Sequence, residues 1–511
     1  VQARPDEPLF LDIQTDFRDG IGARAGTYYP VGIMSDKLVY WLDKSIVDGR
    51  VPSGSFLLNG PLRGFPYHNT HAGHFEVLFD AEDLVLDYQP GWPVLQNTNA
   101  SVRFHNNELQ IDASSAQILD SKVVQASAHI PSLKPRSAIH IQGQANGPLA
   151  DALRLIRETP LQEKFSAAVE GMRASGNTDT KLKLTIPLSE SASYAFEGQL
   201  AMRDAGLKLT QHQLDLVNIN GRLELDLNGI HANGIGFQAL GRELKMNMGQ
   251  SDHASTLIDV AGVLPFAEVQ KQYPFLSPVN ATGEAYTNIQ LDLPNNRKDS
   301  KSSASLRISS DLKGVDVNMP APLAKTSEML RPLSLNLLLD APETDIRISY
   351  ADQVKLHIAQ DEAAGGYRVT GKIKDLPLHD WLGGFSLLEE EEGKPDNFGL
   401  DLLQLDVAHL SLGPFIAADL QLQVDRKQQH WLGRLESNQL QGSFRVPAEL
   451  ETRPLVIRLD KLTMHLAEQP ESSQDQPDAI PEDNLNPLSF PAVDFSCKEL
   501  MMDDARLGEL E

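Results

Sequence analysis

The chain is poor in cysteine, because Cys497 is the only one among its 511 residues. A single thiol forms no intramolecular disulfide and supplies no cysteine-rich metal site. Aromatic residues are also sparse, at 6% of the chain, so leucine, isoleucine and valine provide most of the apolar surface. No run of about 18 apolar residues occurs, and the sequence therefore predicts no helix that crosses a bilayer.

Positive charge is also in short supply. The chain has 45 Lys and Arg against 70 Asp and Glu, a formal net charge of −25. A surface of this sign repels the phosphate backbone, so we expect no nucleic-acid partner. No signal peptide is visible, and the first residue is Val1 rather than Met. We expect a piece of a longer polypeptide, whose targeting or anchoring segment lies outside it.

What the chain does have is a two-residue rhythm. Polar and apolar residues alternate over 181–186, 222–227, 288–293 and 420–424. This period is typical of strands with one wet and one dry face. Turn-forming Asn-Gly and Asp-Gly pairs separate many of these runs and favour hairpins. The predicted fold is mainly β, a long curled antiparallel sheet that forms an open hydrophobic groove, with a few short helices.

The organisation along the chain is predicted from breaks in this rhythm. We expect short helices near 35–47, 266–272, 323–330 and 378–382. We expect one continuous groove rather than separate domains. Its parts would be an N-terminal groove segment over 1–147, a helical insertion over 148–176, a central groove segment over 177–385, and a C-terminal groove segment over 386–511 with mobile acidic loops at 389–395 and 468–485.

Catalytic and metal-binding motifs are weak. His68, His71 and His74 have a regular spacing, but they fall in a turn that does not enforce convergence on one ion. Carboxylate pairs such as Glu82-Asp83 and Asp503-Asp504 are expected from composition alone in so acidic a chain. We therefore predict no enzyme activity, no metal and no cofactor.

The apolar side of the sheet is the candidate functional surface. The helices are too few to cover it, and aliphatic side chains suit acyl chains better than sugars. An ordinary closed core remains the alternative explanation of the same pattern. The residues expected to line a lipid-binding groove are Phe75, Val77, Phe79, Leu84, Leu86, Leu109, Ile111, Leu182, Leu184, Ile186, Leu223, Leu225, Leu227, Ile289, Leu291, Leu293, Ile346, Ile348, Leu420, Leu422 and Val424.

A family resemblance favours the groove. Trp41-Leu42, Gly60-Pro61-Leu62, Phe65-Pro66-Tyr67, Gly73-His74-Phe75 and Trp92-Pro93 follow one another in an order that resembles the YhdP family, the large AsmA-like proteins of Gram-negative envelopes. The stretches 153–188, 262–283, 371–381 and 491–508 also resemble that family. The resemblance covers essentially the whole chain.

The resemblance implies a function and a location. It implies a periplasmic segment of a protein that carries phospholipids between the inner and outer membranes, passively and without catalysis. It also implies an inner-membrane anchor and membrane contacts that lie outside this chain. The implied partners are phospholipid acyl chains, and other envelope proteins are possible partners too. The alternatives are an envelope scaffold or a chaperone-like assembly factor for outer-membrane proteins, and a β-helical carbohydrate-active enzyme.

Overall fold

A computed structural model describes most of the chain. The described residues are 9–29, 36–67, 73–133, 137–162, 169–188, 194–251, 255–294, 303–339, 344–360, 366–382, 400–413, 415–427, 430–447, 453–464, 492–503 and 505–510. By their contacts the residues form two compact units, Val1–Ile258 and Asp259–Glu511. The four-part division expected from the sequence stays a prediction.

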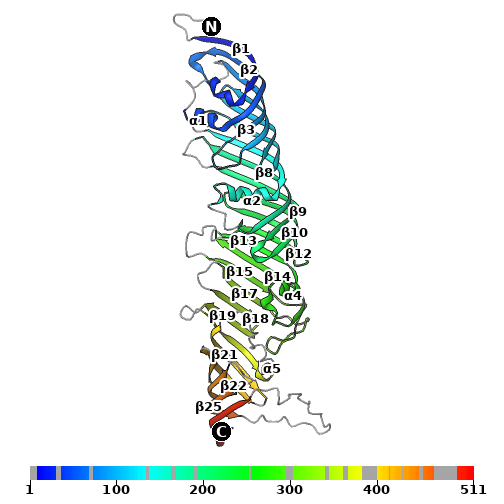
Figure 1. Cartoon of the computed structure of the whole chain (residues 1–511), viewed down its shortest axis with the longest axis vertical. Coiled ribbons are helices and arrows are strands. Elements are labelled where there is room, and N and C mark those ends of the chain that lie inside the picture. Colours follow the sequence, from blue (N-terminus) through cyan, green and yellow to red (C-terminus); the bar gives the residue numbers. More distant parts are fainter. Residues whose placement is uncertain are drawn as a thin grey trace. The chain divides into compact units, whose positions relative to one another are not determined.

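The first unit is a meander in which each strand pairs antiparallel with the next, from β1 to β12. Figure 1 shows these strands side by side in sequence order, from blue to green. Within the described part of the chain, β1 pairs with β2 alone and is an edge strand. The strands are β1 (Phe10–Ile21), β2 (Ile46–Pro61), β3 (His74–Leu86), β4 (Leu95–His105), β5 (Glu108–Ile118), β6 (Ser121–Ile130), β7 (Ala138–Pro148), β8 (Met172–Pro187), β9 (Ala195–Leu209), β10 (Leu214–Asp226), β11 (Ile230–Ala239) and β12 (Arg242–Gln250).

Bulges cross this meander at similar levels on successive strands. The pairing register shifts between Ala81 and Leu84 on β3, and again on β4, β6, β8, β10 and β11. Asp83 and Asn97 have positive φ values of 51° and 50° at two of these shifts. A bulge inserts an extra residue and bends its strand, so Leu84 returns to the same face as Ala81.

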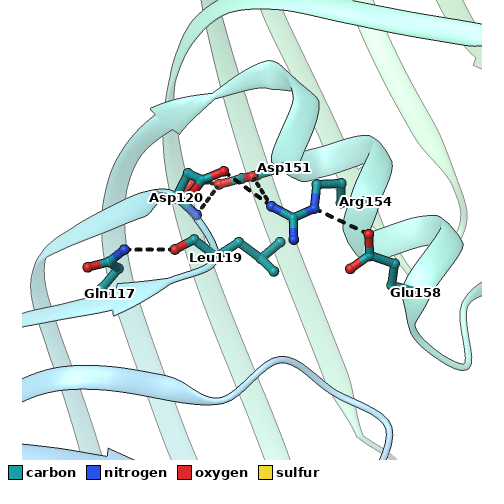
Figure 2. A network of polar contacts seen from close by, with 7 residues as sticks. Gln117, Leu119, Asp120, Asp151, Arg154 and Glu158 are labelled. Carbon is teal, nitrogen blue, oxygen red and sulfur yellow. Dashed lines mark hydrogen bonds and ion pairs between the residues drawn. The ribbon is translucent and has the colours of Figure 1, made fainter.

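Two α-helices lie within the described residues of the first unit. α1 (Asp36–Ser45) lies within the range 35–47 in which the sequence predicts a helix. α2 (Leu149–Glu158) contacts β7 and β8, and polar contacts tie it to the turn between β5 and β6 (Figure 2). Asp151 is 4% exposed and accepts hydrogen bonds from the Asp120 N–H at 3.0 Å and the Ser121 hydroxyl at 2.6 Å.

Arg154 completes the attachment of α2. Its guanidinium lies 3.2 Å from Asp120 and 3.2 Å from Glu158 (Figure 2). The guanidinium also lies 3.5 Å from the buried Asp151, which needs such partners because an isolated charge away from water is costly. β8 begins soon after, at Met172, which is earlier than the strand start near 177 expected from the sequence.

Paired strands also make up most of the described residues of the second unit. β13 (Ser255–Pro265) contains the boundary between the units. The other strands are β14 (Ala281–Pro294), β15 (Ala304–Ser310), β16 (Val315–Val317), β17 (Leu333–Leu339), β18 (Asp345–Tyr350), β19 (Val354–Gln360), β20 (Tyr367–Pro377), β21 (Leu400–Leu412), β22 (Phe415–Lys427), β23 (His430–Glu436), β24 (Leu440–Pro447), β25 (Leu455–Met464), β26 (Val493–Met502) and β27 (Ala505–Leu510).

Two of the pairings described in the second unit are parallel, β20 with β21 and β25 with β26. The alternating pattern does not predict them, because it is blind to strand direction. Parallel neighbours need a connection that returns along the length of a strand. The two acidic segments expected at 389–395 and 468–485 fall in these two connections, and both lie outside the described residues.

The segment between β15 and β17 does not form the helix expected at 323–330. It contains β16, which pairs with the start of β14, and Lys325, which forms a bridge with Val317. Lys325 is 5% exposed, and its ammonium donates to the carbonyls of Leu312, at 2.8 Å, and Val315. Burial lowers the pKa of Lys325. The helices expected at 266–272 and 378–382 are present as α4 (Phe266–Gln272) and α5 (Leu378–Leu382).

The mainly β class with few short helices is confirmed. The pairings show an open sheet, and the expected groove is considered below from the burial of its side chains. Among the described residues, no helix has the length and apolarity needed to cross a membrane.

Candidate apolar binding face

Strand pairing places the expected groove residues of the first unit on one side of the meander. One row of opposed residues runs from β3 to β9 and consists of Phe79, Val102, Ile111, Ala128, Ile141, Leu184 and Phe196. The next row continues to β11 with Ala81, Ala100, Ala113, Ala126, Gly143, Leu182, Gly198, Leu225 and Ile230. We call this surface the first apolar face.

The depth of burial on the first apolar face follows the bulges. Side chains beside the register shifts are almost fully covered, as shown by exposures of 6% for Ala81, 0% for Ala205 and 0% for Ile235. Away from the bulges the face is only half covered: Phe75 and Leu184 are intermediate, and Ile186 is 42% exposed. Bent strands explain this gradient, because residues inside a bend are screened by both arms.

The remaining expected residues of the first unit share this face. Val77 and Leu109 oppose Phe104 from either side, and Leu223 opposes Leu200. Their exposure is intermediate, as it is for Leu84, Leu86, Ile111, Leu182 and Leu225. Leu227 lies just beyond β10 and is 54% exposed. A continuous aliphatic surface therefore stays partly accessible on the described residues of this unit.

A second apolar face runs through the second unit by the same rule. Four of the expected groove residues lie on this side and have intermediate exposure, namely Ile289, Leu293, Ile348 and Leu422. One of its rows consists of Leu291, Leu306, Leu337, Ile346, Ile358, Val369, Leu403, Val424, Gly433, Phe444, Ile457 and Phe495.

From β21 to β26 the chain's own residues cover the second apolar face. Leu420 is 1% exposed, Val407 1% and Cys497 1%, and all three belong to one buried cluster. Val424 is also buried, at 8% exposure. The ordinary-core interpretation therefore holds for Leu420 and Val424, whereas Ile289 and Ile346 remain half covered.

On both apolar faces, some phenylalanine rings pack directly over a glycine of the neighbouring strand. Gly433 opposes Phe444, and a Cβ added to Gly433 would overlap the Phe444 ring. Gly54 opposes Phe17 in the same way, with Phe79 on its other side. The aromatic rings therefore lie flat over neighbouring backbone, and this close approach requires glycine.

The opposite side of the sheet is polar and carries exposed ion pairs. Examples in the first unit are Lys183–Glu197 at 3.2 Å and Arg203–Asp179 at 2.6 Å. Such exposed pairs add little stability each, but they keep this side hydrated. In the second unit, a hydrogen bond from Arg458 lowers the pKa of Asp494. The two sides of each unit thus differ sharply in polarity.

The groups considered for catalysis do not assemble into an active site on the described residues. Glu82 and Asp83 both face Arg50, at 3.7 and 2.5 Å, in an exposed ion cluster. Burial raises the pKa of the Cys497 thiol, which disfavours the reactive thiolate. His68, His71 and Asp504 lie outside the described residues. Asp503 is exposed at the end of β26.

Sequence reasoning missed one constellation. His74, Glu76 and His105 come together on the polar side, although only His74 belongs to the histidine motif noted from the sequence. His74 and Glu76 are neighbours on β3, but His105 lies on β4, and only the strand pairing joins them. No sequence signal short of the hairpin register would have found this set.

Comparisons with known proteins identify a family for the chain. A sequence model of the YhdP protein family matches residues 2–511. The chain is similar to the "Intermembrane phospholipid transporter YhdP" of Escherichia coli (strain K12), with 23% identity over 344 residues. The aligned region is 66% of this chain and 26% of that relative, so the chain spans about a quarter of the relative's length. No solved structure matches the chain.

Proposed function

Because the chain belongs to the YhdP family, we propose that it is a lipid-conducting segment, in which the first apolar face holds the acyl chains of phospholipids. The observation that carries this proposal is the run of opposed aliphatic residues that crosses β3 to β11 and stays half covered outside the bulges. The described part of the second apolar face between β14 and β19 serves in the same way.

Hydrocarbon transfer supplies the driving force for binding. Each methylene removed from water is worth about 0.8 kcal/mol, so a phospholipid does not cross water unaided at a useful rate. An aliphatic surface such as that formed by Ile141, Leu184 and Phe196 lowers this barrier without any covalent step. Headgroups remain in water at the margin of the face. Movement along the face is passive, and its direction and energy come from elsewhere.

The name of the relative supports a proposal for where the chain acts. A transporter between two membranes acts in the space that separates them, and we place this chain in the periplasm. We propose that the protein is anchored in the inner membrane and contacts both membranes. Other envelope proteins would meet it there as well.

Photo-crosslinking along β8 tests the proposal. A photoreactive amino acid is placed in turn at Lys181, Leu182, Lys183 and Leu184, the protein is incubated with phospholipid vesicles, and crosslinked lipid is measured by mass spectrometry. We expect lipid adducts at Leu182 and Leu184 and background at Lys181 and Lys183, because the side chains alternate between faces.

Two outcomes would count against lipid conduction. Equal lipid labelling at all four positions indicates non-specific adsorption to vesicles. Protein adducts without lipid at Leu182 and Leu184, in a repeat of the experiment in cells, would favour the scaffold or chaperone alternative.

A further inference from the structure

The set of His74, Glu76 and His105 lies at one end of the β3–β4 hairpin. Glu76 directly opposes His105 across the two strands, and His74 is two residues before Glu76 on the same face. One ligand atom from each side chain falls within 4.8 Å of the other two. Among the described residues, no other three histidine, cysteine or acidic side chains converge in this way.

The distances suit a small tetrahedral ion. The His74 ring nitrogen Nε2 is 3.5 Å from Glu76 Oε2. Two ligands on one zinc ion lie about 3.4 Å apart when each bond is about 2.0–2.1 Å. The rings of His74 and His105 have centroids 5.1 Å apart, so a small side-chain adjustment brings both nitrogens to one ion.

His105 provides an independent sign of a missing partner. Its Nδ1 atom is buried and has no hydrogen-bond partner among the described residues. A buried polar atom left without a partner costs about 1–3 kcal/mol. A ligated cation gives this imidazole the partner that it lacks.

Arg103 prepares the carboxylate. Its Nε atom donates to Glu76 Oε1 at 2.7 Å, while Oε2 faces His74. Arg103 therefore fixes one oxygen of the Glu76 carboxylate and leaves the other turned toward His74. Arg103 is a positioning residue in this arrangement.

We propose that His74, Glu76 and His105 form a divalent transition-metal site, with zinc as the best-fitting ion. Two imidazoles and one carboxylate are a known zinc donor set that leaves a fourth position for water. The site is on the polar side, opposite to Phe75 and Val77 of the first apolar face, so it is separate from the proposed lipid path. A bound ion would link β3 to β4 where the strands meet the β4–β5 turn.

Zinc titration of the purified chain tests the site. The protein is first dialysed against a chelator, and zinc affinity is then measured by competition with a chromophoric chelator. We expect one site that is weakened at least about tenfold by His105→Ala and by Glu76→Gln, since even the loss of an outer partner of a ligand costs about 10–100-fold. The control is His231→Ala, which removes a histidine 3.6 Å from Asp226 in the same unit and should leave the affinity unchanged.

Thermal unfolding supplies a second measurement that keeps the test valid if a variant is less stable. Zinc should raise the unfolding temperature of the wild type and of His231→Ala, because an ion bound only by the folded state stabilises it. Zinc should not raise that of His105→Ala. Equal zinc affinity in all four proteins, or no stoichiometric binding by the wild type, would overturn the proposal.

Discussion

Leu184→Asp places a charge on the first apolar face where the face is half covered. Leu184 opposes Ile141 on β7 and Phe196 on β9, so the new carboxylate sits within an aliphatic row. Without lipid the carboxylate remains partly hydrated, and the loss of half-buried leucine surface costs about 1 kcal/mol of folding stability. We therefore expect the variant to fold.

Lipid occupancy should respond much more strongly. Covering a carboxylate with hydrocarbon costs several kcal/mol even after relaxation. A penalty of about 3 kcal/mol reduces the local acyl-chain occupancy by about a hundredfold. Aspartate is a sharper probe than lysine at Leu225, because a long lysine side chain can carry its charge out to water.

The assay places a photoreactive amino acid at Leu182, two residues before the substitution and on the same face. The lipid adduct is quantified in the wild type, in Leu184→Asp and in Thr185→Asp, whose charge faces the polar side next to His140. We expect loss of the adduct in Leu184→Asp alone. Undiminished labelling in Leu184→Asp, or an equal loss in Thr185→Asp, would refute the assignment of acyl chains to this face.

Three further predictions concern stability in the second unit. Leu420→Ala should lower the free energy of unfolding by about 2–5 kcal/mol in urea titrations, because Leu420 is 1% exposed in a closed cluster; a loss below about 1 kcal/mol would show that this region is not a packed core. Gly433→Ala should destabilise by about 1–3 kcal/mol through overlap with Phe444, and Phe444→Leu in the same chain should recover part of the loss. Arg458 lowers the pKa of Asp494, so this pair stabilises the fold above about pH 4, the ordinary pKa of an aspartate. That stability is lost as the pH falls through the lower pKa of the folded state. Between neutral pH and pH 3, Asp494→Asn should therefore lose less folding stability than the wild type, and identical losses would contradict the linkage.

The sequence predicted which face of each strand is apolar better than it predicted how deeply that face is buried. The alternation over 181–186 and 420–424 is the same, and both runs place their leucines on the apolar side. Leu184 is nevertheless half covered, whereas Leu420 is buried in a closed cluster. Local pattern determines which side of a strand is dry, but the packing of distant strands determines whether that side stays open.

Bulges and distant partners also escaped the sequence. Asp83 and Asn97 take positive φ inside strands, and as single polar residues they are indistinguishable from ordinary solvent-facing positions. The parallel partners of β20 and β25 lie across long connections that carry no direction signal. His105 meets His74 only through the hairpin register.

The meander of the first unit has a kinetic consequence. Each strand from β2 to β11 hydrogen-bonds to the strands just before and just after it in the chain. Contacts between near neighbours along a chain close small loops and form quickly. The unit can therefore fold one hairpin at a time while the chain is being synthesised. The unpaired backbone edge of the newest strand is the template to which the next strand hydrogen-bonds.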